Sequence, residues 1–177
     1  IATRIHERAT SLAAGLEAKG IKVLNTNYFD TLRVEADATA VRQRAEAAGV
    51  NFRYFENGNI GIAVSEVTTD ADVAEIISLI SGSNGASGKA SNAIGSFART
   101  SSYLTHPNFN THHSETEMLR YLKKLENKDL SLTHAMIALG SCTMKLNATS
   151  EMIPLTWLEF ANIHPFAPVS QAAGYNE

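Results

Sequence analysis

The hydrophobic pattern over residues 1–82 changes period several times along the chain. Between residues 2 and 19, apolar side chains such as Leu12 and Leu16 recur at helical spacing, and Gly20 stands where a helix commonly ends. Between residues 31 and 36, apolar side chains alternate with charged ones, which is typical of a half-buried strand. Both periods recur further along, and the segment therefore predicts the order α-β-β-α-β-β-α.

Capping and turn residues set the boundaries of these elements. Asp37 can accept a backbone N–H as the N-cap of an alanine-rich helix, and Gly49 ends that helix. Glu56-Asn57-Gly58 joins two strands, because an Asn-Gly step readily adopts the positive φ angles of a tight hairpin. Thr69 and Asp72 resemble a capping box. We therefore expect helices at 2–19, 38–48 and from 68–72 onward, and strands at 22–28, 31–36, 51–55 and 59–64.

These elements predict one α+β domain over residues 1–82. The apolar positions on the inward sides of the helices and strands should form its core. The expected core residues are Leu12, Leu16, Val34, Val41, Phe52, Ile62, Val73, Ile76 and Ile80.

The pattern breaks after residue 82. Gly, Ser, Asn and Ala dominate there, and we interpret residues 83–100 as a flexible linker. In the third segment, 101–177, Ser114 and Glu117 form a capping box that opens a helix over 115–127. A helix over 150–160 should be interrupted near Pro154, and another should begin at Ser170. We expect this mainly helical and extended segment to bury its apolar residues poorly on its own.

Composition narrows the possible functions. The 177 residues carry 15 Lys and Arg against 18 Asp and Glu, without a basic block, which predicts no binding to nucleic acid or to an anionic membrane. No apolar run approaches the ~20 residues of a membrane-spanning helix. The single Cys142 excludes an intramolecular disulfide framework and a zinc site built on several thiolates. The chain opens at Ile1 with neither an initiator methionine nor a signal pattern, and we expect it to come from a longer polypeptide.

Three histidines, His106, His112 and His113, lie within eight positions and suggest a metal site. Adjacent side chains in an extended segment point to opposite faces, however, and rarely share one ion. The chain also lacks a HExxH pattern and partner thiolates. We therefore predict no metal site.

A second candidate is the polar block Gly140–Asn147, which lies between an apolar segment and a helix. Its backbone N–H groups and hydroxyls could bind a carboxylate or a phosphate, with Lys145 as a cation. Cys142 could be a nucleophile or a redox sensor. From the residues alone, an ordinary loop remains an alternative.

The segment 103–177 resembles the glycine cleavage system P-protein family. The resemblance rests on LTHPNFNTHHSETEMLRYLKKLENKDLSL at 104–132 and on MIALGSCTMKLNATSEMIPLTWLEFANIHPFAPVSQAAGY at 136–175. Residues 1–82 are compatible with the small C-terminal domain of that enzyme's N-terminal half, which has the fold-type I arrangement of pyridoxal phosphate enzymes. Residues 101–177 would then be the N-terminal arm of the second half, and the chain would span the junction of the two halves.

The resemblance implies an oxidoreductase that uses pyridoxal phosphate to decarboxylate glycine. It would transfer the aminomethyl group to the lipoyl arm of H-protein, and it would be a homodimer or an assembly of two halves. The family occurs in bacterial cytoplasm and in mitochondria. Its Schiff-base lysine lies in a His-Lys context beyond Glu177, whereas Lys145 follows a methionine. We therefore expect no catalytic residue in this chain and no activity from the chain alone.

The resemblance also suggests which residues lie near the pocket. We expect four side chains of the polar block to approach the cofactor or the glycine carboxylate: Ser141, Cys142, Thr143 and Lys145. His106 and His164, each before a proline, are weaker candidates with a more structural role. The alternative function is a non-catalytic docking or regulatory module, since residues 1–82 contain no cluster of acids, bases or nucleophiles.

Overall fold

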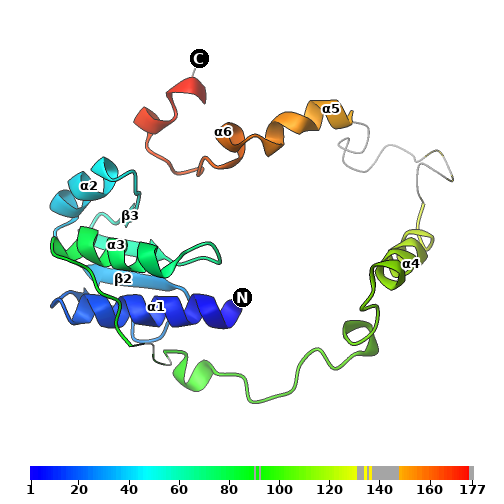
Figure 1. The fold of residues 1–177 in the computed structure, drawn as a ribbon, viewed down its shortest axis with the longest axis horizontal. Coiled ribbons are helices and arrows are strands. Elements are labelled where there is room, and N and C mark those ends of the chain that lie inside the picture. Colours follow the sequence, from blue (N-terminus) through cyan, green and yellow to red (C-terminus); the bar gives the residue numbers. More distant parts are fainter. Residues whose placement is uncertain (90, 92, 131–133, 135, 137–147, 176–177) are drawn as a thin grey trace. The chain divides into compact units, whose positions relative to one another are not determined.

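The computed structural model describes residues 1–89, 91, 93–130, 134, 136 and 148–175 (Figure 1). The chain divides into two compact units, Ile1–Arg99 and Thr100–Glu177, which we call unit 1 and unit 2.

Unit 1 contains the predicted order of elements. Its helices and strands are α1 (Ala2–Glu17), β1 (Lys22–Val23), β2 (Thr31–Glu35), α2 (Ala38–Ala47), β3 (Arg53–Tyr54), β4 (Asn59–Ala63) and α3 (Asp70–Ser81). A 3₁₀ helix follows at Gly95–Phe97. The prediction of an α+β domain with four strands is confirmed.

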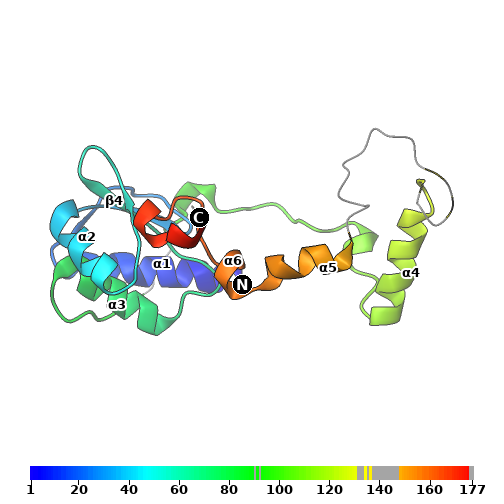
Figure 2. The same cartoon turned by 90° about the horizontal axis from the view of Figure 1, so that it is seen from above.

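The four strands form one antiparallel sheet in the order β1-β2-β4-β3. Leu32 and Val34 of β2 pair with Ile62 and Ile60 of β4, and all four side chains are buried on one face of the sheet. Helices α1 and α3 contact each other, and they lie side by side in both views (Figures 1 and 2). The helices cover the buried face. We call the opposite face of the sheet its outer face.

The core of unit 1 contains most of the predicted positions. Phe52 and Ile76 are only partly buried, but they pack against it. The remaining seven predicted residues are buried: Leu12, Leu16, Val34, Val41, Ile62, Val73 and Ile80. The prediction missed Ala9, Ala13, Leu32, Ile60, Val64 and Ile77.

Strand β1 is much shorter than the predicted 22–28 because a side chain replaces the backbone ladder. The Asn25 amide donates to the Thr31 carbonyl at 2.9 Å, and its side-chain oxygen accepts the Arg33 N–H at 2.8 Å. The chain therefore stays beside β2 beyond Val23 without forming a regular strand.

The predicted helix caps are present. Asp37 accepts the N–H groups of Thr39 and Ala40 at the start of α2. Thr69 and Asp72 form a reciprocal capping box at α3, and the backbone N–H of Thr69 holds the pKa of Asp72 below its ordinary 3.8. These contacts satisfy N–H groups that the first turn of a helix leaves without an intrahelical partner.

The described residues of the segment after α3 lie against unit 1. The Gly88 N–H donates to the Ser11 carbonyl at 2.9 Å, and the Tyr28 N–H donates to the Ala93 carbonyl at 3.3 Å. A Cβ atom at Gly85 would overlap the carbonyl oxygen of Ala74 in α3. The compact unit thus extends to Arg99, past the predicted domain end at residue 82. The predicted flexibility of 83–100 stays a prediction.

Unit 2 contains short elements. They are α4 (Glu115–Glu126), α5 (Thr149–Met152), α6 (Leu158–Ala161) and 3₁₀ helices at Pro107–Phe109, Ile153–Thr156, Val169–Gln171 and Ala173–Tyr175. The helix at 115–127 and the interruption near Pro154 are confirmed. The prediction of a helix beginning at Ser170 is wrong, because the described residues there form two short 3₁₀ turns.

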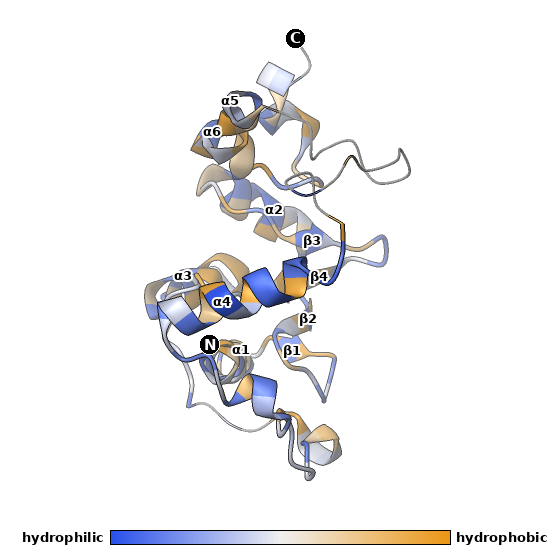
Figure 3. Cartoon of the chain, turned by 90° about the vertical axis from the view of Figure 1, so that its right-hand side faces the viewer, coloured by the Kyte–Doolittle hydropathy of each residue, from blue (hydrophilic) through white to orange (hydrophobic). Residues whose placement is uncertain are grey.

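No described residue of unit 2 is buried. Helix α4 shows this most clearly, since Met118 and Leu119 are 44% and 58% exposed although the helix has separate apolar and charged sides (Figure 3). This agrees with the expectation that the segment buries little apolar surface alone. Among the described helices of both units, none is long and apolar enough to cross a membrane.

Candidate functional site

The strongest sequence candidates lie outside the described residues. Ser141, Cys142, Thr143 and Lys145 all fall within 137–147. After this segment, α5 begins at Thr149 with Ala148 as an N-cap that has no side-chain hydrogen bond. The expectation that the four side chains approach a cofactor or the glycine carboxylate stays a prediction.

The two weaker candidates, His106 and His164, have similar local contacts. His106 Nδ1 accepts the backbone N–H of Asn108 at 3.2 Å, and His164 Nδ1 accepts that of Phe166 at 3.1 Å. Both side chains are exposed. Each ring therefore caps the turn that its own His-Pro step begins, a local structural role.

The neighbouring histidines also have separate partners. His112 stacks on Tyr121 with ring centroids 4.2 Å apart, whereas His113 Nε2 donates to the Asn110 carbonyl at 2.9 Å. Across the described parts of the chain, no three His, Cys, Asp or Glu side chains are placed to hold a metal ion.

The described lysines do not fit a covalent cofactor site. Pyridoxal phosphate would need a lysine amine held in a pocket beside groups that bind the ring and the phosphate. Every described lysine is exposed. Two of them are in ion pairs, Lys22 with Glu35 at 4.0 Å and Lys123 with Glu126 at 2.9 Å. None of the described lysines therefore has the surroundings that this cofactor needs.

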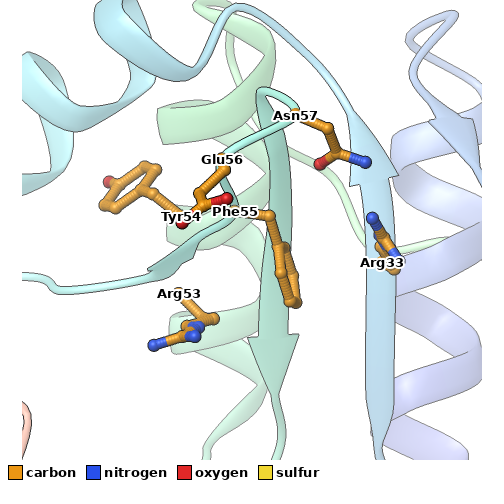
Figure 4. A pocket seen from close by; sticks show the side chains of 6 residues that line it. All are labelled: Arg33, Arg53, Tyr54, Phe55, Glu56 and Asn57. Carbon is orange, nitrogen blue, oxygen red and sulfur yellow. The ribbon is translucent and has the colours of Figure 1, made fainter.

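The outer face of the sheet carries a cluster that the sequence interpretation missed. Arg33 on β2 and Arg53 on β3 both pair with Gly61 of β4, which places them on either side of that strand. The Phe55 ring lies over Gly61, where a Cβ atom would come within 3.1 Å of the ring. Figure 4 shows Phe55 between the two arginines. We call these three side chains the Arg–Phe–Arg cluster.

The two guanidinium groups are held by the aromatic ring. The Cζ atom of Arg33 lies 4.6 Å from the centroid of Phe55, and that of Arg53 lies 5.5 Å from it. With the Asn59 amide turned so that its oxygen faces Arg33, it accepts from Nε at 3.0 Å and from Nη2 at 3.1 Å. Cation–π contact thus orients both cations, and hydrogen bonding to Asn59 also orients Arg33, without neutralising either charge.

The cluster lines an open hollow of about 520 Å³, together with Tyr54, Glu56 and Asn57. Burial raises the pKa of the Tyr54 hydroxyl above its ordinary 10.0; Arg42, whose Cζ atom lies 4.3 Å from the ring centroid, opposes this shift, and Glu46 adds to it. Tyr54 therefore stays neutral near pH 7, and Glu56 is the acidic residue in the lining.

Sequence signals for this cluster exist but are weak. Arg33 is a polar position that alternates with Leu32 and Val34, and Phe55 stands at the end of a predicted strand. Their proximity depends on the pairing of β2 with β4, which no local pattern predicts.

Comparison with known proteins relates this sequence to one family. The family described as "Glycine cleavage system P-protein" matches residues 1–80. The chain is 54% identical to "Glycine dehydrogenase (decarboxylating)" of Shewanella amazonensis, over 100% of this chain and 20% of the relative. It is 52% identical to the protein of the same name from Stutzerimonas stutzeri, over 99% of this chain and 19% of the relative. It is 49% identical to the protein of that name from Nostoc punctiforme, over 99% of this chain and 20% of the relative.

Unit 1 is a small α+β domain with helices on one face of an antiparallel sheet. Residues 1–80 match the glycine cleavage system P-protein family, and the curated relatives match nearly the whole chain, including the segment 103–177 that carried the resemblance. The chain spans about a fifth of the length of the curated relatives it matches.

Proposed function

We propose that this chain is part of a glycine decarboxylase that depends on pyridoxal phosphate. The observation that carries the proposal is the match to curated glycine dehydrogenases (decarboxylating), at 54% identity over all of this chain. The match includes both units. The activity itself belongs to the longer polypeptide, because the chain corresponds to only a fifth of such an enzyme.

Within that enzyme, unit 1 would be the small C-terminal domain of the first half, in the fold-type I arrangement. Its four-stranded sheet with helices on one face supports this assignment. The residues from 101 onward would be the N-terminal arm of the second half. The exposed apolar side of α4 supports this role, since an arm packs on a larger body.

Pyridoxal phosphate, when bound, supplies an electron sink that stabilises the carbanion left after loss of CO2. The lysine that holds it would lie in the remaining polypeptide. Ser141, Cys142, Thr143 and Lys145 would contribute donors and a cation to one wall of the pocket or to the glycine carboxylate. On this proposal, the 177-residue chain alone does not turn over glycine.

The partner that accepts the aminomethyl group would be lipoylated H-protein, and the enzyme would be a homodimer or an assembly of two halves. The family's description as part of the glycine cleavage system supports the first assignment.

The test uses the complete protein that contains this chain, supplied with pyridoxal phosphate and glycine labelled at its carboxyl carbon. We expect labelled CO2 to be released, and to be released much faster when lipoylated H-protein is present. H-protein that lacks the lipoyl group is the matched control and should not give this increase. Absence of labelled CO2 under all of these conditions would contradict the proposal.

A further inference from the structure

The outer face of the sheet in unit 1 differs in charge from the chain as a whole. The chain has a net charge of -3, whereas the strands place Lys22, Arg33 and Arg53 on this face against Glu35, and Glu56 lines the hollow beside the two arginines. Lys22 and Glu35 face each other across β1 and β2, at 4.0 Å. The two arginines therefore carry the excess positive charge of this face.

Neither arginine of the Arg–Phe–Arg cluster forms an ion pair with any residue that the structure describes. Arg44 provides the contrast, because its guanidinium donates to the carbonyls of Leu79 and Ile80 at 2.8 and 3.2 Å and so has a structural role. Stacking on Phe55 uses the faces of the guanidinium groups. Asn59 accepts from the Nε and Nη2 atoms of Arg33, which leaves the Nη1 atom of Arg33 and the guanidinium edge of Arg53 for a planar acceptor such as a carboxylate.

The shape of the cluster favours an extended ligand over a small one. Small-molecule sites enclose most of the ligand surface, whereas this hollow is open on the face of a sheet. Phe55 also stands between the two guanidinium groups, and one small anion would have to reach around the ring to contact both (Figure 4). A polypeptide with two spaced carboxylates meets both without that constraint.

We propose that the Arg–Phe–Arg cluster is a docking site for an acidic segment of a partner protein, lying across β2, β4 and β3. Its carboxylates would accept hydrogen bonds from Arg33 and Arg53, and its apolar atoms would cover Phe55. Oriented arginines beside an aromatic ring are typical of residues that dominate protein interfaces. This inference is independent of the glycine decarboxylase proposal, since it rests on unit 1 alone.

The test titrates the full 177-residue chain, labelled with ¹⁵N, with a synthetic peptide of alternating Glu and Ala. We expect amide shifts at Arg33, Arg53 and Gly61. Replacing both arginines, R33Q with R53Q, should weaken binding about tenfold or more, because both charged contacts are lost. F55L should weaken it several-fold, since it removes the stacking that orients the guanidinium groups. Thermal unfolding of each variant shows whether unit 1 remains folded.

The matched control is R120Q, which removes the same charge from an exposed position on α4 of unit 2. It should leave peptide binding within twofold of the unsubstituted chain. Equal weakening by R120Q, or undiminished binding by the double variant, would overturn the proposal. So would the same shifts with acetate at equal carboxylate concentration, which indicate a small-anion site, or with added unlabelled chain, which indicate self-association.

Discussion

Helices α1 and α4 have similar local signals and very different surroundings. In α1, Leu12 and Leu16 are fully buried against the sheet and α3, whereas in α4 Leu119 and Leu122 are 58% and 52% exposed. The amphipathic pattern was sufficient to predict both helices, and α4 has the better cap, a reciprocal capping box. The difference shows that local sequence determines where a helix forms, while its tertiary contacts determine how much it stabilises.

The largest expected effect comes from replacing one leucine by alanine in each of the two helices. Leu12→Ala should lower the free energy of unfolding of unit 1 by about 3 kcal/mol, because it leaves a cavity in a packed core. Leu122→Ala is the same change at a half-exposed position, and it should leave the unfolding of unit 1 unchanged. Urea denaturation followed by circular dichroism measures both. Equal destabilisation by the two variants would contradict the comparison.

A smaller effect is expected where the segment after α3 approaches the helices. Gly85→Ala should destabilise unit 1 by about 1–3 kcal/mol or detach the segment, because the new Cβ atom would overlap the Ala74 carbonyl. Detachment should speed hydrogen exchange at the Gly88 amide, which donates to Ser11. Gly174→Ala is the control, since no atom lies within 4 Å of a Cβ there. An unchanged Gly88 exchange rate together with unchanged stability would show that this contact is not formed.

The capping boxes allow a third comparison. Thr69→Ala should cost about 1 kcal/mol in the unfolding of unit 1, because α3 belongs to the core. Ser114→Ala removes the equivalent cap from α4, and it should lower helical content without shifting the unfolding midpoint of unit 1. A shift of that midpoint by Ser114→Ala would mean that α4 unfolds together with unit 1.

The smallest expected effect is a dependence on acid pH. Hydrogen bonds from the backbone and side chain of the N-cap hold the pKa of Asp72 below 3.8 and that of Glu117 below 4.5. A lowered carboxylate pKa stabilises the fold above the unfolded value, and this contribution is lost as pH falls through the folded value. Asp72→Asn should therefore make the stability of unit 1 fall less as the pH is lowered, whereas Glu117→Gln should not change this fall. Denaturation midpoints between neutral pH and about pH 3 test this.

Local patterns predicted the elements of unit 1 well, for identifiable reasons. The alternation in β2 and the caps at Asp37 and Thr69 depend only on residues that are close in sequence. The shortening of β1 was missed, because Asn25 gives no sign in the sequence that its side chain will replace a ladder hydrogen bond.

The candidate site residues also differ in whether their contacts are local or long-range in sequence. The Arg–Phe–Arg cluster depends on the long-range pairing of β2 with β4, which hydrophobic periodicity does not specify. The contacts of Gly85 and Gly88 were also missed, because a glycine that permits close packing has the same composition signal as one in a flexible linker. His106 and His164 make local turn contacts, and their expected structural role stays a prediction.

The most direct test of the central claim locates the cofactor lysine in the complete protein. Pyridoxal phosphate is reduced onto the protein with borohydride after CO2 release from glycine has been measured, and the modified lysine is mapped by mass spectrometry. We predict an active protein whose pyridoxyl-lysine lies outside the segment Ile1–Glu177. A pyridoxyl group on Lys145, or a protein that releases no CO2 from glycine, would contradict it.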